Sequence, residues 1–191
     1  MKLILASTSP FRKSILEKLC IKFETLAPNV DESRLANETP QALVERLAIE
    51  KARDVANKYN DALVIGSDQV AIIGDTILGK PGSAENAFTQ LQASSGKTVI
   101  FYTGLCVLNS ANNNMHSSVE RFAVTFRDLS NAEIETYINK EQPLNCAGSF
   151  KSEGLGIALF EKLQGDDPNT LIGLPLIRTI EFLKREGLNV L

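Results

Sequence analysis

The sequence has few of the residues on which zinc sites, disulfide frameworks and redox centres depend. It contains one histidine, His116, and three cysteines. A single histidine excludes zinc sites built from several histidines as well as the H-E-x-x-H motif, and it disfavours a Ser–His–Asp triad. Cys20, Cys106 and Cys146 lie far apart and form no C-x-x-C pair. This scatter favours reduced thiols in a cytosol-like compartment.

Long apolar runs and an excess of basic charge are also missing. No apolar segment approaches the roughly 20 residues that span a bilayer, and the first apolar run is too short for a signal peptide. The formal net charge is −3, so no general positive field attracts nucleic acid. We therefore expect a cytoplasmic protein that binds neither membranes nor nucleic acid. An anionic ligand would need a local cluster of bases or a metal ion.

Helix and strand signals alternate along the chain, without internal repeats or a clear linker. They predict a single α/β domain over residues 1–191, with a mixed sheet because both hairpins and crossover helices occur. Its length suits one sizeable domain or two small lobes around a cleft. Gly74 and Asp75 are expected to form a hairpin turn, "QGDDPNT" a loop, and Pro175 the start of the last helix.

The stretch "LILASTSPFRKSILEKL" predicts a short strand, a polar turn and a helix. Ser9 can cap this helix and Pro10 fits its first turn. A helix N-terminus favours anions, yet Arg12 and Lys13 stand in the same turn, where cations are disfavoured. Their presence is explained if a strongly negative ligand binds there. The alternative is a well-capped helix with two solvated bases.

A lysine lies on the apolar face of the helix expected over residues 40–59. Lys51 is four residues from both Leu47 and Val55, so it shares their face. A lysine there is costly unless its ammonium reaches water or a partner. Either the side chain extends along the apolar stripe to water, or it projects into a cleft to meet an anion.

Carboxylates occur at two places that suit chemistry. Asp68 is expected directly after the buried strand of "VIGSDQV", where Gly66 and Ser67 let the backbone turn or pack closely against a neighbour. Strand ends carry the sites of α/β folds, so Asp68 could hold a divalent metal or accept a proton from water. The alternative is an ordinary turn aspartate. Gln69 beside it could recognise a donor–acceptor edge of a ligand.

The second place is the loop that contains Asp31 and Glu32. Paired carboxylates suit Mg²⁺ or Mn²⁺, although an acidic loop pair is also commonly just solvated. Lys80, in "GKP", follows no P-loop spacing and is a weak signal alone. Taken together, these bases and acids fit a complex of a metal with a polyphosphate. The bases are Arg12, Lys13, Lys51 and Lys80, and the acids are Glu32 and Asp68.

Eight stretches occur in one order along the chain: "LILASTSPFRKSIL", "VDES", "RLAIEKA", "IGSDQV", "GKP", "FYTG", "CAGSFKSEG" and "GLPL". On these stretches the chain resembles the Maf-like nucleotide pyrophosphatases over nearly its whole length. It looks most like the branch that acts on 7-methyl-GTP, because it carries Phe11, Gln69 and Glu153. The dTTP/UTP branch typically has arginine, threonine and glutamine there. The 7-methyl-GTP branch is expected to have tryptophan where this chain has phenylalanine, a weaker cation–π partner.

The resemblance implies a mixed twisted sheet flanked by helices, with two lobes around a cleft, related to inosine triphosphate pyrophosphatase-like folds. It implies a hydrolase of phosphorus-containing acid anhydrides that cleaves between the α and β phosphates. The products would be a nucleoside monophosphate and pyrophosphate. It also implies a divalent metal (Mg²⁺, Mn²⁺ or Co²⁺), a cytoplasmic location and a homodimer. The alternatives are a dTTP/UTP pyrophosphatase of the same family and a non-catalytic nucleotide-sensing or cell-division regulator.

The resemblance also implies roles for residues. Asp68 matches the proton acceptor, with Glu32 and Asp68 as metal ligands, so Asp68 could be the base or a ligand. Phe11 would stack on a cationic 7-methylguanine, and Glu153 would accept hydrogen bonds from its N1–H and amino group, with Gln69 as the third specificity residue. The triphosphate would be bound by Ser7, Ser9, Arg12, Lys13, Lys51 and Lys80, of which the last two are catalytic.

Overall fold

The computed structural model describes all residues, 1–191, and the chain divides into two compact units. Each unit is assembled from segments that are distant in the sequence. Unit 1 comprises Met1–Gln69, Tyr102–Glu120 and Asp167–Leu191, and unit 2 comprises Val70–Phe101 and Arg121–Asp166. No helix is both long and apolar enough to cross a membrane.

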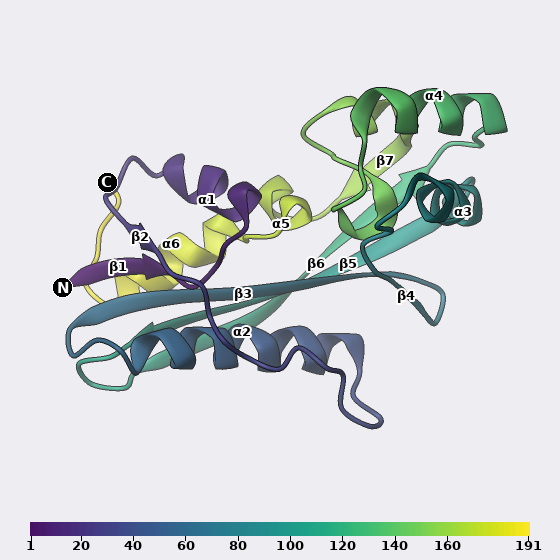
Figure 1. The fold of residues 1–191 in the computed structure, drawn as a ribbon. Helices are drawn as coiled ribbons and strands as arrows, with labels where there is room; N and C mark the ends of the chain where they lie inside the picture. Colours follow the sequence, from purple (N-terminus) through teal and green to yellow (C-terminus); the bar gives the residue numbers. More distant parts are fainter. The chain divides into compact units, whose positions relative to one another are not determined.

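The elements form a mixed α/β structure, as expected (Figure 1). The strands are β1 (Lys2–Leu5), β2 (Glu24–Thr25), β3 (Ala62–Ile73), β4 (Thr76–Leu78), β5 (Thr98–Asn109), β6 (Met115–Phe126) and β7 (Phe160–Gln164). The helices are α1 (Pro10–Glu17), α2 (Pro40–Ala56), α3 (Ala84–Ser94), α4 (Asn131–Glu141), α5 (Pro168–Ile172) and α6 (Leu176–Arg185), with the 3₁₀ turns η1 (Ala147–Ser149) and η2 (Leu155–Leu159).

One sheet of seven strands has the order β2-β1-β3-β5-β6-β7, with β4 paired to β3. β1 runs parallel to both β2 and β3, whereas β4 is antiparallel to β3 and β7 is antiparallel to β6. The strands β3, β5 and β6 each contribute residues to both units. The mixed sheet confirms the expectation from hairpins and crossover helices.

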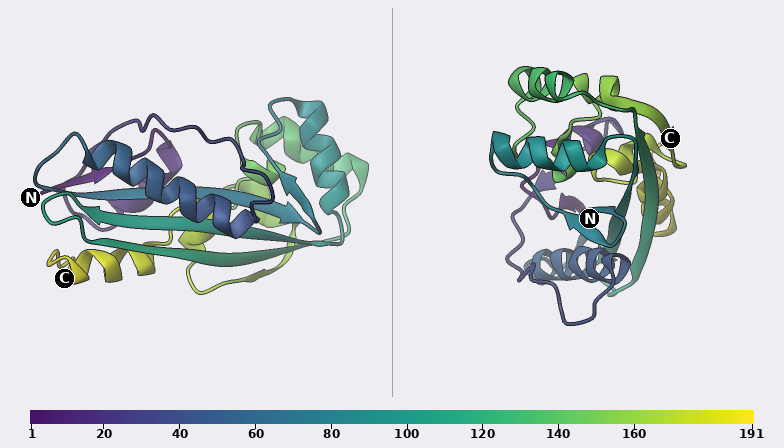
Figure 2. Two further views of the ribbon diagram at one scale, coloured as in Figure 1. Left: turned by 90° about the horizontal axis from the view of Figure 1, so that it is seen from below. Right: turned by 90° about the vertical axis from the view of Figure 1, so that its right-hand side faces the viewer.

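In unit 1 the sheet is covered on both faces by helices, which Figures 1 and 2 show from three sides. Side chains alternate along a strand, so Leu3 and Leu5 point to one face and Ile4 to the other. Leu3 and Leu5 pack in a core with Ile15 of α1 and Phe182 of α6, while Ile4 packs in a second core with α2. Each such buried side chain contributes roughly 1.5–3 kcal/mol to folding.

The helix α2 lies unusually close to the sheet because glycines face it. A Cβ atom on Gly66 of β3 would lie 2.1 Å from the carbonyl oxygen of Ala48, and one on Gly104 of β5 would lie 2.1 Å from that of Val44. No real Cβ makes such contacts, so only glycine allows this packing. The close approach brings the middle of α2, which carries Lys51, against β3.

Most expected helix starts are confirmed. The hydroxyl of Ser9 accepts a hydrogen bond from the backbone N–H of Arg12 and caps α1. Ser130 and Glu133 form a reciprocal capping box at the start of α4. The helix α2 ends at Ala56, a few residues before the expected position 59.

Two expectations about the chain are wrong. The segment "QGDDPNT" is not all loop, because its last residues begin the short helix α5. Asp167 caps this helix by accepting a hydrogen bond from the backbone N–H of Asn169, and Pro168 fills its first position. The strand β3 also does not end before Asp68 but continues to Ile73. Gly66 serves the close approach of α2 there and makes no turn.

Unit 2 has an aromatic core of its own. Phe150 packs edge-on against three other phenylalanine rings, with centroids 4.9 to 5.5 Å apart. These rings belong to Phe101, Phe126 and Phe160. Edge-to-face pairs add roughly 0.5–1.5 kcal/mol each beyond the burial of their area. The hairpin turn at Gly74 and Asp75, between β3 and β4, is also in this unit and confirms the prediction.

Candidate active site

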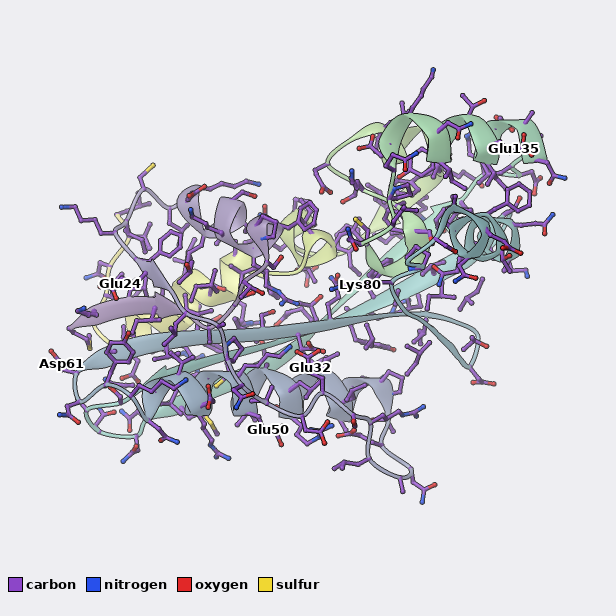
Figure 3. All side chains as sticks on the ribbon, viewed as in Figure 1. Glu24, Glu32, Glu50, Asp61, Lys80 and Glu135 are labelled. Atoms are coloured by element: carbon purple, nitrogen blue, oxygen red, sulfur yellow. The ribbon has the colours of Figure 1, made fainter.

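The ammonium of Lys51 lies between two carboxylates. Its Nζ atom is 2.7 Å from Oδ1 of Asp68 and 2.6 Å from Oε1 of Glu32. Lys51 comes from α2, Asp68 from β3 and Glu32 from the long loop between β2 and α2, where Figure 3 labels it. All three belong to unit 1. We call Glu32, Lys51 and Asp68 the ion triad.

The ion triad is buried at one end and open at the other. Lys51 and Asp68 are 5% and 9% exposed, whereas the side chain of Glu32 is 62% exposed. A buried charge is tolerated only when it is paired, so Lys51 and Asp68 depend on each other. The periodicity correctly placed Lys51 on the buried face of α2. Its side chain does not extend to water but meets these two carboxylates.

The position of Asp68 within β3 has a simple cause. Residues two apart in a strand point to the same face, so Asp68 shares the face of Gly66. Gly66 admits the backbone of α2, and Asp68 therefore meets the lysine of that helix. We expected this carboxylate at a strand end. It lies instead inside β3, which is one of three strands with 12 residues in this sheet.

Of the two neighbouring acids in the loop, Asp31 and Glu32, only Glu32 pairs with Lys51. Asp31 is exposed and accepts a hydrogen bond from the backbone N–H of Ser33 at 2.9 Å. Glu32 binds Lys51 instead. Arg46 of α2 holds the loop by donating to the carbonyl oxygen of Ser33 at 3.0 Å and to the carboxylate of Glu38 at 2.7 Å.

A second cation stands near the two acids. Arg12 donates from Nε to the carbonyl oxygen of Gly173 at 2.9 Å. Loss of hydration lowers the pKa of its guanidinium, and attraction to Asp68 and Glu32 acts in the opposite direction. Because an arginine stays protonated in proteins, Arg12 remains a cation at neutral pH. The Nε contact uses one donor of the guanidinium, whose other N–H groups are donors suited to an anion.

The hydroxyls of the first turn shape the backbone around Arg12. Ser7 is buried, and its Oγ accepts a hydrogen bond from the backbone N–H of Ser9 at 3.1 Å. Ser9 in turn caps α1. Lys13 is exposed and lies 3.7 Å from the carboxylate of Glu17. The binding of phosphate by Ser7, Ser9 and Lys13 stays a prediction.

Gln69 is bound to the chain itself. Its amide nitrogen donates to Oγ1 of Thr103 at 2.9 Å and to the carbonyl oxygen of Thr170 at 2.7 Å. The side chain therefore ties β3 to β5 and α5. The sequence analysis missed Thr103 and Ser67 as buried polar partners. The sequence signal for such partners is that Ser67 and Gln69 are two residues apart in a strand. They therefore share one face, and polar side chains buried there need polar partners.

The remaining expected site residues are Phe11, Lys80 and Glu153. Phe11 is half-buried on α1 of unit 1. Lys80, labelled in Figure 3, and Glu153 are exposed residues of unit 2. Glu153 lies 3.4 Å from the hydroxyl of Ser152. That Phe11, Lys80 and Glu153 meet one substrate stays a prediction.

The two carboxylates fit a divalent cation. One oxygen atom of Glu32 and one of Asp68 both contact the ammonium of Lys51, at 2.6 Å and 2.7 Å. No group of three or more acidic, histidine or cysteine side chains forms an all-protein cage. Mg²⁺ is commonly bound by one or two carboxylates together with substrate phosphates. The donor set therefore suits a cation that arrives with a phosphorylated substrate.

Comparison with known proteins gives consistent matches over almost the whole chain. The sequence model of one family, described as "Maf-like protein", matches residues 2–186. A 7-methyl-GTP pyrophosphatase of Colwellia psychrerythraea is 60% identical over 189 residues, which are 99% of this chain and 94% of the relative. A 7-methyl-GTP pyrophosphatase of Vibrio vulnificus is 56% identical over 190 residues, which are 100% of this chain and 97% of the relative.

Among solved structures, the Ham1 protein of Staphylococcus aureus has a similar fold. The TM-score is 0.55 at 14% sequence identity, over 97% of this chain and 100% of that one. At this identity the likeness concerns the fold alone. It confirms the expected relation to inosine triphosphate pyrophosphatase-like folds.

Proposed function

Because the chain belongs to the Maf-like protein family, we propose that it is a nucleotide pyrophosphatase that hydrolyses 7-methyl-GTP to 7-methyl-GMP and pyrophosphate. The observation that carries this proposal is the ion triad, with Arg12 beside it. Two cations and two acids close together, buried at one end and open to solvent at the other, suit water attack on a polyphosphate. The names of the relatives that are 60% and 56% identical support the choice of substrate.

Asp68 is the proton acceptor in this proposal. Water must lose a proton as it attacks the α-phosphorus, and a carboxylate in a nearly dry site can take it. The ammonium of Lys51 donates a hydrogen bond to Oδ1 of Asp68 at 2.7 Å and so holds this carboxylate in place. The bond between the α-phosphorus and the bridging oxygen then breaks, and pyrophosphate leaves.

Arg12 and Lys51 neutralise the triphosphate. The planar guanidinium of Arg12 can donate two parallel hydrogen bonds to phosphate oxygens through its Nη atoms. Negative charge grows on the leaving pyrophosphate, so cations fixed in advance lower the barrier. We assign Lys80, Ser7, Ser9 and Lys13 to the same triphosphate on the family resemblance.

Glu32 would hold a divalent cation, Mg²⁺, Mn²⁺ or Co²⁺, and Asp68 would be a second ligand only if another group accepts the proton. When bound, the cation would add positive charge next to the phosphates and help to orient the water. The ammonium of Lys51 fills the point between these carboxylates.

The methylated base would be recognised by a ring and an acid. Phe11 would stack on 7-methylguanine, whose cationic form favours an aromatic face. Glu153 would accept hydrogen bonds from N1–H and the amino group. Gln69 is bound to Thr103 and Thr170, so its effect on specificity would be exerted through the backbone of α5.

We further propose a cytoplasmic protein that works on a small nucleotide, without nucleic acid or membrane as partner. The three cysteines are free, which supports a reducing compartment. A homodimer is proposed on the family resemblance alone.

The test is pyrophosphate release from 7-methyl-GTP, GTP, dTTP, UTP and CTP, with Mg²⁺, Mn²⁺ and Co²⁺ assayed separately. We expect the highest kcat/KM for 7-methyl-GTP and no activity with EDTA. A preference for dTTP or UTP would keep the reaction but overturn the substrate. Tight nucleotide binding without product in any metal would favour a nucleotide-sensing role.

A further inference from the structure

The carbonyl oxygen of Gly173 lies within hydrogen-bond distance of two side-chain donors. Arg12 donates to it from Nε at 2.9 Å, and Oγ of Ser67 is also 2.9 Å away. The single hydroxyl hydrogen of Ser67 is shared between this carbonyl oxygen and that of Gly104, which is 2.8 Å away. Ser67 is fully buried, so its hydroxyl has no water to replace these partners. The three groups Arg12, Ser67 and Gly173 connect α1, β3 and the end of α5.

The contact at Nε determines how Arg12 can present its charge. A guanidinium is planar, so a hydrogen bond at Nε fixes the plane and leaves the two Nη groups facing one direction. That arrangement is the one needed to bind two oxygens of a phosphate. Without the Nε contact the side chain would sample several rotamers and lose entropy on binding.

The position of the Gly173 carbonyl is determined by the C-terminal end of α5. Gly173 has a φ of +118°, which favours glycine, and its N–H donates to the carbonyl oxygens of Asn169 and Thr170. Gln69 donates to the carbonyl oxygens of Thr170 and Leu171. The end of α5 is thus attached to β3 by side chains from that strand.

Ser67 and Gln69 flank Asp68 on β3. Neighbouring residues of a strand point to opposite faces, so Ser67 and Gln69 face α5 while Asp68 faces α2 and Lys51. Asp68 is thus the proposed base on one face of β3. On the other face Ser67 and Gln69 contact the end of α5, to which Arg12 also donates a hydrogen bond.

We propose that Ser67 is a positioning residue that holds Arg12, through the carbonyl of Gly173, in the orientation that binds the substrate's phosphates. This inference rests on the proposed function, because it assigns Arg12 to a phosphate. Ser67 itself touches no substrate. Its role is to fix the carbonyl that fixes the guanidinium.

The experiment is a double-mutant cycle of Ser67→Ala and Arg12→Lys in the full chain. Arg12→Lys keeps the positive charge and lacks the Nε–H group. We expect Ser67→Ala to raise KM for 7-methyl-GTP by about fivefold to tenfold with kcat nearly unchanged, as for one lost hydrogen bond. In the Arg12→Lys background, Ser67→Ala should change KM by less than about twofold.

A matched control is available in unit 2. Ser94 is also fully buried and donates from Oγ to the carbonyl oxygen of Gln90 at 2.8 Å. Ser94→Ala removes the same kind of hydrogen bond away from Arg12 and should leave KM unchanged. If Ser67→Ala does not fold, Ser67→Cys keeps the size and replaces the donor by a weak one.

Binding of inorganic tripolyphosphate, measured by titration calorimetry, gives a readout that needs no turnover. Weaker binding on Ser67→Ala in the wild-type background, and none of this loss in the Arg12→Lys background, supports the proposal. Equal loss in both backgrounds, or no loss, overturns it. A chain that shows the coupling to tripolyphosphate but hydrolyses no nucleotide would refute the proposed function and leave the positioning role standing.

Discussion

A single buried ammonium, that of Lys51, neutralises both acids of the candidate site. Asp68 is nearly buried with it, whereas Glu32 is open to solvent. Removing one partner of a buried pair leaves an uncompensated charge, which costs about 3–5 kcal/mol, while removing both costs less. Lys51 and Asp68 should therefore be coupled in stability.

We expect Lys51→Met to lower the free energy of unfolding by about 3 kcal/mol. Adding Asp68→Asn should restore part of this loss, with a coupling energy of roughly 1–3 kcal/mol. Urea unfolding of the wild type, both single variants and the double variant measures it. Strictly additive losses would mean that the pair seen at 2.7 Å does not contribute as a pair.

The sequence predicted some residues of the site better than others. Lys51 could be found because one charge interrupts a regular apolar face. Asp68 was also a candidate, but its contact with Lys51 could not be predicted, since a contact across 17 positions depends on how closely a helix packs on a strand. For Gly66 the sequence left two roles open, a turn or a close approach of the backbone, and only the packing of α2 decides for the close approach.

At the scale of elements, the loop that carries Glu32 is fastened to α2 by Arg46. Hydrogen bonds from Arg46 lower the pKa of Glu38 to about 2. In the unfolded chain its pKa is near 4.5. A depressed carboxyl pKa contributes stability above the unfolded value, and the contribution is lost as the pH falls toward the folded value.

We therefore expect Arg46→Gln to lower the free energy of unfolding at pH 7, by an amount that shrinks below pH 4.5 and disappears near pH 2. Urea unfolding at several pH values measures the difference from wild type. Arg53→Gln is the control, because the side chain of Arg53 donates a hydrogen bond only to the sulfur of Met115, at 3.9 Å. A pH-independent effect of Arg46→Gln would contradict the assignment to Glu38.

The packing of α2 on the sheet gives a second prediction at this scale. Gly66→Ala places a Cβ 2.1 Å from the backbone of Ala48, so α2 must move. We expect a loss of about 3 kcal/mol in stability, measured by thermal or urea unfolding. Gly79→Ala, with nothing within 4 Å, should change stability by less than about 0.5 kcal/mol. Equal stability of both variants would contradict the close packing.

The short helix α5 could not be predicted from local sequence patterns. Its five residues are too few for a hydrophobic period, and "QGDDPNT" is composed of loop-forming residues. What makes it helical is the cap from Asp167 and the fastening of its end by Ser67 and Gln69. Those tertiary contacts leave no local pattern in the sequence.

At the scale of the whole molecule, the alternation of strands and helices was enough to predict a mixed α/β fold. Apolar strands and capped helices depend on local sequence patterns, so they can be predicted from the sequence. The assignment of residues to units was not predictable, because β3, β5 and β6 each contribute to both. The residues proposed to determine specificity illustrate this, with Phe11 and Gln69 in unit 1 and Glu153 in unit 2.

We expect the triple variant Phe11→Arg, Gln69→Thr and Glu153→Gln to favour dTTP or UTP over 7-methyl-GTP. The ratio of kcat/KM values should shift by about tenfold or more, since an aromatic face and an acid suited to 7-methylguanine are both removed. Thermal unfolding of the variant checks that the loss of Gln69 has not unfolded α5. An unchanged ratio in a folded variant would show that other residues select the base.

The most direct measurement of the central claim is product formation from 7-methyl-GTP by wild type, Asp68→Asn and Asp31→Asn. Asp31 is the matched control, because it is an exposed acid next to Glu32 that does not reach Lys51. We expect 7-methyl-GMP and pyrophosphate from wild type and Asp31→Asn, with a rate about 10²–10⁴-fold lower for Asp68→Asn. Release of 7-methyl-GDP and phosphate, or full activity of Asp68→Asn, would contradict it.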